Sequence, residues 1–143
     1  HSGSITAIYT VLAEGDNQND PIVDSARAVL DGHIVLSRRI AEKGQFPAID
    51  IEASISRLMN TLASPEHRQW ASQFRKILSQ YHQNEDLINT GIYQPGSNPE
   101  LDHAIRVYPQ LIQYLRQDIH EVADFAPSLS RLQAVIELNP VTP

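Results

Sequence analysis

Two kinds of hydrophobic pattern divide the chain. The first segment, Ser4 to Leu12, is an apolar run rich in Ile, Thr, Tyr and Val and carries no charge. Such a run predicts a strand buried on both faces, as in a parallel sheet. Beyond Leu62 the apolar residues recur every three or four positions, which is the period of a helix face. The pattern therefore predicts an α/β part over residues 1–62 and an all-α domain over residues 63–143.

The N-terminal part alternates strands with short helices, which is typical of α/β folds. Glycines mark the helix ends, with Gly32 expected as a C-cap and Gly44 as a stop. The expected elements after the first strand are a polar loop over 13–21, a helix over Ile22–Leu30, a strand over His33–Leu36 and a helix over Ser37–Lys43. Two or three strands cannot cover themselves, so we expect them to belong to a larger sheet.

The C-terminal part predicts helices with clear starting points. Ser64-Pro65 and Asn98-Pro99 each combine an N-cap residue with proline at the first helical position, and Ser128 is expected to cap the last helix. Pro109 is expected to kink or restart the second helix. The apolar faces are formed by Trp70, Phe74, Ile77, Leu78 and Tyr81, by Leu101, Ile105, Tyr108, Ile112, Leu115 and Ile119, and by Leu129, Leu132, Val135 and Ile136.

Composition narrows the function classes. The formal net charge of −6 argues against nucleic acid as a partner, because phosphate binding needs clustered Lys and Arg. No cysteine is present, which excludes disulfides and thiolate metal sites. No apolar stretch approaches the roughly 18 residues of a membrane span. The six histidines show no metal-ligand spacing, so we predict no metal site.

Three sequence blocks carry more specific information. They are Gly3-Ser4-Ile5-Thr6, SARAVLDGHIVLSRR over 25–39, and GQFPAIDIEASISRLM over 44–59, which ends in Ser54-x-Ser56-Arg57. Together they resemble the C-terminal part of the catalytic subunit of a rotary-type ATPase, and most closely the flagellar export ATPases. No G-x-x-x-x-G-K-[ST] motif occurs in the 143 residues, so the chain lacks the loop that cradles phosphates.

The resemblance implies a fold and a nucleotide site. The fold would be a partial parallel sheet from a truncated nucleotide-binding core, followed by a helical domain, with helices dominating overall. Arg57 would be an arginine finger that acts in trans, and Phe46 and Phe125 would contact the adenine, with Ile119 in place of a second aromatic. A planar, permanently charged guanidinium suits this role. From residue type alone, a salt-bridged surface arginine and core-packed phenylalanines remain alternatives.

The resemblance also implies surfaces for partners. In the relatives, the loop that corresponds to 13–21 faces a central stalk, so Asp16, Asn17 and Asp20 are candidates for contact. The connection over Gly91–Asn98 corresponds to the tip of a helical hairpin. It is neutral here and carries Ile92 and Tyr93, which predicts a docking surface. A solvated loop and a simple helix connection are the alternatives.

The function implied for the parent is that of a homohexameric ATPase that energises flagellar or type III protein export. It would use ATP and Mg²⁺ and lie in the cytoplasm, peripheral to the inner membrane at the export apparatus. Its partners would be a central stalk protein, chaperone–substrate complexes and the export gate. The chain alone is expected to be inactive and to bind neither ATP nor Mg²⁺. The alternatives are a helical binding module for chaperones, substrates or a stalk protein, and a subunit of another rotary ATPase.

Overall fold

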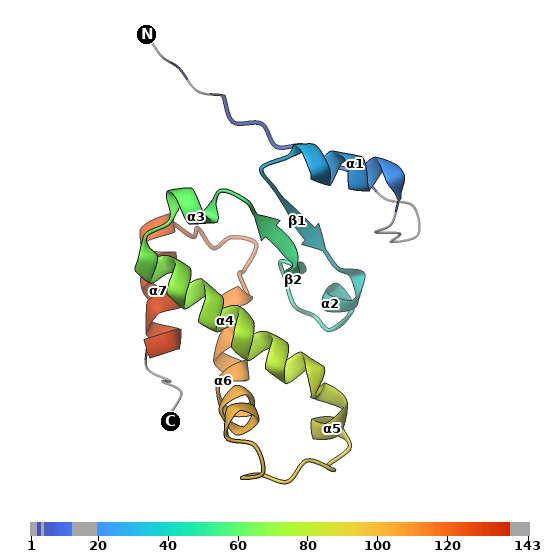
Figure 1. Ribbon diagram of the computed structural model, residues 1–143, viewed down its shortest axis with the longest axis vertical. Coiled ribbons are helices and arrows are strands. Elements are labelled where there is room, and N and C mark those ends of the chain that lie inside the picture. Colours follow the sequence, from blue (N-terminus) through green and yellow to red (C-terminus); the bar gives the residue numbers. More distant parts are fainter. Residues whose placement is uncertain (1–2, 4, 13–19, 138–143) are drawn as a thin grey trace.

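The structure is a computed structural model that describes residues 3, 5–12 and 20–137. Figure 1 shows the α/β part in the upper half of the view and a bundle of longer helices below it. The elements are, in order, α1 (Pro21–Val29), β1 (Gly32–Leu36), α2 (Arg38–Glu42), β2 (Ile49–Ser56), α3 (Met59–Leu62), α4 (Pro65–Gln83), α5 (Glu85–Asn89), α6 (Pro99–Leu115) and α7 (Phe125–Glu137). The predicted class, a truncated α/β core followed by a helical domain, is confirmed.

The hydrophobic core lies among α4, α6 and α7, which pack side by side. Ala104, Val107 and Leu111 of α6 are fully buried at its centre. The faces predicted from the three-and-four spacing supply most of the other buried side chains. These are Phe74, Ile77, Leu78, Leu101, Leu132 and Ile136. This burial is the main source of stability in the chain, because apolar area removed from water contributes roughly 25 cal/mol per Å².

Two of the predicted helix starts are confirmed in detail. The Ser64 hydroxyl accepts a hydrogen bond from the His67 amide at 3.2 Å, and the Asn98 side chain accepts from the Glu100 and Leu101 amides. The prediction for the last helix is wrong. Helix α7 begins at Phe125, and Ser128 lies inside its first turn, where both its amide and its hydroxyl donate to the Asp124 carbonyl.

The predicted restart at Pro109 does not occur, because α6 continues across it to Leu115. Proline removes one amide donor from the helix and crowds the preceding turn. The neighbouring Val107 and Leu111 are fully buried, so packing against α4 and α7 outweighs this local cost.

The sheet differs from the predicted parallel arrangement. Strands β1 and β2 pair antiparallel, with Gly32 opposite Ser56 and Leu36 opposite Ile49. Strand β2 was not predicted, although Ile49–Ser56 alternates apolar and polar residues strictly, which is the period of a half-buried strand. The predicted strand at the N-terminus is also wrong, since residues 5–12 form no strand and Ile5 is 98% exposed. Strand hydrogen bonds come from a neighbour, and no backbone hydrogen bond joins residues 5–12 to another described segment.

Gly32 has a different role from the predicted helix cap. Helix α1 ends at Val29, and Gly32 is the first residue of β1. A Cβ atom at Gly32 would lie 2.5 Å from the Ile55 carbonyl oxygen, so the glycine permits β1 and β2 to approach closely. No helix in the described part of the chain combines the length and the apolar character that a membrane span requires.

His103 is a buried polar residue in α6, only 5% exposed. The Arg106 guanidinium donates to its Nδ1 at 3.1 Å, while its Nε2 has no hydrogen-bond partner among the described residues. Burial, followed by the positive charge of Arg106, lowers the pKa of His103 below its ordinary value of 6.5. The folded chain therefore favours the neutral imidazole.

We expect the free energy of unfolding to fall as the pH drops below 6.5, because the unfolded chain then binds a proton that folded His103 resists. Glu66, Glu85 and Glu100, whose pKa values are lowered from 4.5, add their own loss only below about that pH. Urea unfolding at several pH values between these limits measures the slope. His103→Gln should flatten it, whereas exposed His120→Gln should keep it. An unchanged slope in His103→Gln would contradict the assignment.

Candidate functional site

Arg57 lies where β2 ends, at the side of the α/β part that carries α1. Its amide donates to the Asp31 carbonyl at 2.8 Å. Its guanidinium donates from one terminal nitrogen to the Ala28 carbonyl at 3.0 Å and from the other to the Arg27 carbonyl at 2.9 Å. These carbonyls belong to the last turn of α1, where helix carbonyls lack helical partners and the helix dipole is negative. These hydrogen bonds therefore hold the positive charge of Arg57 at the C-terminal end of α1.

The Arg57 side chain remains exposed although it is anchored. A guanidinium carries five N–H donors, and the two carbonyls of α1 use only two of them. No further hydrogen bond or ion pair of its guanidinium is found among the described residues. The group can therefore present charge and further donors to an anion outside this chain.

An open groove of about 970 Å³ lies between the α2–β2 connection and the segment after α6. Phe46 lines it and is 59% exposed, and the Phe46 carbonyl accepts from the Gln117 amide at 3.0 Å. The Phe46–Pro47 peptide bond is cis. The remaining lining residues are Gly44, Pro47, Gln113, Arg116, Gln117, Asp118, Ile119, Glu121 and Arg131. The groove offers one aromatic face, one exposed aliphatic side chain and several polar groups.

The structure brings Phe46 and Ile119 together in this groove but does not place Phe125 among its lining residues. Phe125 begins α7, is 72% exposed and makes an edge contact with His67, with ring centroids 6.1 Å apart. Arg116 and Arg131, which no sequence motif pointed to, also line the groove. Arg116 is the C-cap of α6 and Arg131 lies within α7, and a single arginine in either place carries no distinguishing sequence signal.

The predicted partner residues fall into three situations. Asp16 and Asn17 lie outside the described residues. The Asp20 carboxylate caps α1, accepting from the Ile22 amide at 2.7 Å and from the Val23 amide at 3.4 Å. Ile92 and Tyr93 lie in the connection between α5 and α6, at the end of the molecule far from the sheet (Figure 1).

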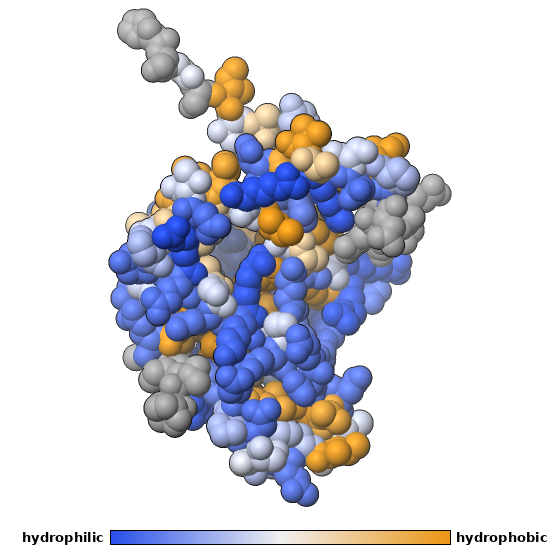
Figure 2. Space-filling model, in the orientation of Figure 1, coloured by the Kyte–Doolittle hydropathy of each residue, from blue (hydrophilic) through white to orange (hydrophobic). Residues whose placement is uncertain are grey.

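The sequence had indicated that Ile92 and Tyr93 form one exposed apolar pair. The structure shows that they do not. Ile92 is 69% exposed. Figure 2 shows apolar surface at this end of the molecule. Tyr93 packs against the hydrophobic core, and its hydroxyl donates to the Asn98 carbonyl and to Asp102 Oδ1. Asp102 Oδ2 also accepts from the Gly96 amide at 2.8 Å. The Asp102 carboxylate therefore holds both Tyr93 and Gly96 of the connection against the start of α6.

No group of three or more His, Asp or Glu side chains that could hold a metal ion occurs in the described residues. The chemistry available is thus an anchored cation beside α1 and a mixed apolar and polar groove.

Comparisons with known proteins match both parts of the chain. The family model of the type III secretion EscN ATPase C-terminal domain matches residues 63–134, and that of the ATP synthase alpha/beta nucleotide-binding domain matches residues 1–56. The flagellum-specific ATP synthase of Salmonella typhimurium is 56% identical over 133 residues, which cover 93% of this chain and 29% of the relative.

Solved structures agree with these matches. The assembled ATPase EscN of the enteropathogenic E. coli type III secretion system superposes with a TM-score of 0.90 at 44% identity, over 93% of this chain and 32% of that one. EscN in complex with its central stalk EscO gives a TM-score of 0.83 at 40% identity, over 93% of this chain and 31% of that one.

The two-part fold and these matches place the chain in the ATP synthase alpha/beta class. The chain belongs to the flagellar and type III secretion ATPase family within it and is the C-terminal portion of such an ATPase. It spans 29% of the length of its flagellar relative from Salmonella.

Replacing the two tip residues separately tests the arrangement at Tyr93. Ile92→Ser should change the free energy of unfolding by less than about 0.5 kcal/mol, because the side chain is exposed. Tyr93→Phe removes the single hydroxyl proton that the Asn98 carbonyl and Asp102 Oδ1 share, so it should cost on the order of 1 kcal/mol or more. Urea unfolding of both variants measures the difference. Equal destabilisation by both would contradict the described geometry.

Proposed function

We propose that the parent of this chain is a Mg-ATP-dependent ATPase that energises flagellar or type III protein export. Its active sites would lie between subunits of a homohexamer. One subunit would supply the phosphate-binding loop and the residues that hold Mg²⁺, none of which this chain contains. The neighbouring subunit would supply Arg57 as an arginine finger in trans. The parent would work in the cytoplasm, peripheral to the inner membrane at the export apparatus.

One observation carries the assignment of Arg57. Its guanidinium is exposed yet anchored to the Ala28 and Arg27 carbonyls, and this leaves donors available on the outer side. Negative charge spreads over the phosphoryl oxygens during transfer, and an arginine finger is worth about 10³–10⁵ in rate in well-studied cases. Pre-orientation matters because a group already in place costs no reorganisation at the moment of reaction.

The groove supports a proposal for the base. Phe46 presents an aromatic face on which adenine would stack, and Ile119 also lines the groove. Phe125 would reach the base only if the parent assembly brought it closer, since it does not line the groove here.

We divide the parent's C-terminal portion into the end of its nucleotide-binding core, residues 1–62, and a helical domain, residues 63–143. The concentration of the core in α4, α6 and α7 supports this boundary. The helical domain and the 13–21 loop, with Asp16, Asn17 and Asp20, would meet a central stalk protein. The tip with Ile92 and Tyr93 would dock export partners, including chaperone–substrate complexes and the export gate.

Arg57→Ala in the full-length parent should reduce turnover by orders of magnitude with little change in nucleotide affinity, because the interaction forms mainly in the transition state. Arg57→Lys should rescue little, since an ammonium lacks the planar fork. ATP hydrolysis by assembled rings measures the effect. Arg38→Ala is the matched control, because exposed Arg38 pairs with Glu42 and with no other residue in the described part of the chain. Near wild-type turnover in Arg57→Ala would exclude the finger.

A mixing experiment separates action in trans from action in cis. Subunits with Arg57→Ala are mixed with subunits whose phosphate-loop lysine is replaced by alanine, each inactive alone. If Arg57 acts in trans, mixed rings contain interfaces with both an intact loop and an intact arginine, and activity returns. Absence of recovery in rings of verified mixed composition would contradict the trans assignment.

The chain by itself should bind Mg-ATP weakly and should not hydrolyse it. It lacks the phosphate cradle, and base stacking contributes only about 1–3 kcal/mol, which corresponds to a millimolar or weaker site. Calorimetric titration of the chain with Mg-ATP tests this, with the full-length parent as the positive control. Micromolar affinity of the chain would overturn it.

A further inference from the structure

Strand β2 contains a large bulge just before Arg57. His33 of β1 pairs with Ile55, whereas Val35 pairs with Asp50. The single residue Ile34 therefore lies opposite the whole segment 51–54 of β2. Bulges re-aim side chains and are over-represented beside active sites.

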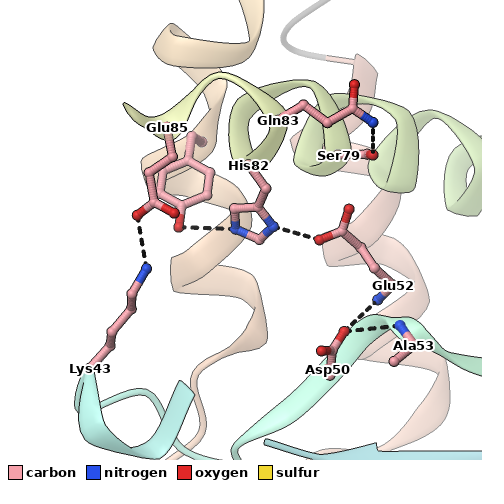
Figure 3. A network of polar contacts seen from close by, with 9 residues as sticks. Lys43, Asp50, Glu52, Ala53, Ser79, His82, Gln83 and Glu85 are labelled. Carbon is pink, nitrogen blue, oxygen red and sulfur yellow. Dashed lines mark hydrogen bonds and ion pairs between the residues drawn. The ribbon is translucent and has the colours of Figure 1, made fainter. Parts of the chain in front are cut away.

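The bulge is stabilised from within by its own polar groups. Asp50 Oδ1 accepts from the Glu52 amide at 3.0 Å and from the Ala53 amide at 2.9 Å, as Figure 3 shows. The Ser54 hydroxyl accepts from the Val35 amide at 2.9 Å and donates to the Asp50 carbonyl. The segment Asp50–Ser54 is therefore an ordered feature and not a loose irregularity of the strand.

Helix α4 holds this segment from the outside with a row of side chains. Arg68, Arg75 and His82 recur every seven residues, which is close to two helical turns and places them on one side of α4. Each of these three side chains contacts a different residue of β2 or α3. Arg75 donates to the Ser54 carbonyl, His82 Nδ1 contacts the Glu52 carboxylate, and Arg68 donates to the Asn60 carbonyl at 2.7 Å.

A neighbouring ion pair adds to this contact. Lys43, just after α2, pairs with Glu85 of α5 at 2.8 Å, and Figure 3 shows it beside the His82–Glu52 contact. The polar row thus joins the helical part to the strand that ends at Arg57.

We propose that α4 sets the position of Arg57 through the Asp50–Ser54 bulge, with Arg75 as the main positioning residue. Ser54 lies only three residues before Arg57, and the close approach of Gly32 to Ile55 constrains the strand between them. A shift of the Ser54 carbonyl is therefore passed along β2 to the Arg57 backbone. The catalytic consequence rests on the proposed function of Arg57, whereas the mechanical coupling does not.

The coupling is tested on the chain itself by amide hydrogen exchange. Arg75→Ala should speed exchange of the Arg57 amide, which donates to Asp31, with little change in the amides around Val107 in the helical core. Lys76→Ala is the matched control, since Lys76 adjoins Arg75 but pairs with Glu100 of α6. Unchanged exchange at Arg57 in Arg75→Ala would overturn the coupling.

The catalytic consequence is tested by a double-mutant cycle in the full-length parent. Arg75→Ala should lower kcat on the order of ten- to a hundredfold with little change in KM, because a small misplacement of a positioned group is costly. In the Arg57→Ala background it should have no further effect on kcat, because the residue through which it acts is gone. Lys76→Ala should leave kcat unchanged in both backgrounds.

The outcomes separate this proposal from the finger assignment. An equal fall in kcat in both backgrounds would exclude Arg75 as a positioning residue while Arg57 keeps its role. Faster exchange of the Arg57 amide without any fall in kcat would exclude it as well. If Arg57→Ala itself turns over normally, the proposed function fails and the catalytic positioning fails with it. The exchange result then still decides whether α4 holds the end of β2.

Discussion

The packing of α4 is the interaction on which both parts of the structure depend. Phe74, Ile77 and Leu78 on one face are buried against α6 and α7. Arg75 and His82 contact β2. The same helix therefore completes the hydrophobic core and supports the strand that precedes Arg57. Because close-packed interiors deform little, a rigid core is a firm base for those polar contacts.

The two sets of contacts differ in strength and in purpose. Burial of large apolar side chains supplies most of the free energy of folding in the helical part. The polar contacts of Lys43, Glu52 and Arg75 lie at the surface, where such interactions contribute little to stability because water competes for them. These contacts orient β2 relative to α4. The hydrophobic core supplies the free energy that keeps α4 in place.

The tip of the helical part and the α1 side of the α/β part each hold an exposed group in place. At the tip, Tyr93 and Asp102 fix the connection while Ile92 projects outward. Beside α1, backbone carbonyls fix Arg57 while its remaining donors project outward. Holding an exposed side chain in place before binding lowers the conformational entropy lost when a partner or ligand is engaged.

The sequence by itself determined the apolar faces of α4, α6 and α7 and the starts of α4 and α6. Cap residues such as Ser64 and Asn98 and the three-and-four spacing of apolar residues act locally, so they could be read without the fold. The resemblance carried by the block over 44–59 led in the same way to the roles proposed for Arg57 and Phe46. These features depend on residues that are close in the sequence, so the sequence alone predicts them.

Only the tertiary structure decided the rest. The antiparallel pairing of β1 with β2, the bulge over Asp50–Ser54 and the close approach at Gly32 depend on a partner strand that the local pattern does not specify. The continuity of α6 across Pro109 depended on buried contacts that outweigh a local penalty. The separation of Phe125 from the groove and the contacts of Arg75 arise from how distant segments meet in space. Hydrogen-bond partners and packing between distant segments are properties of the folded chain, so no local pattern could contain them.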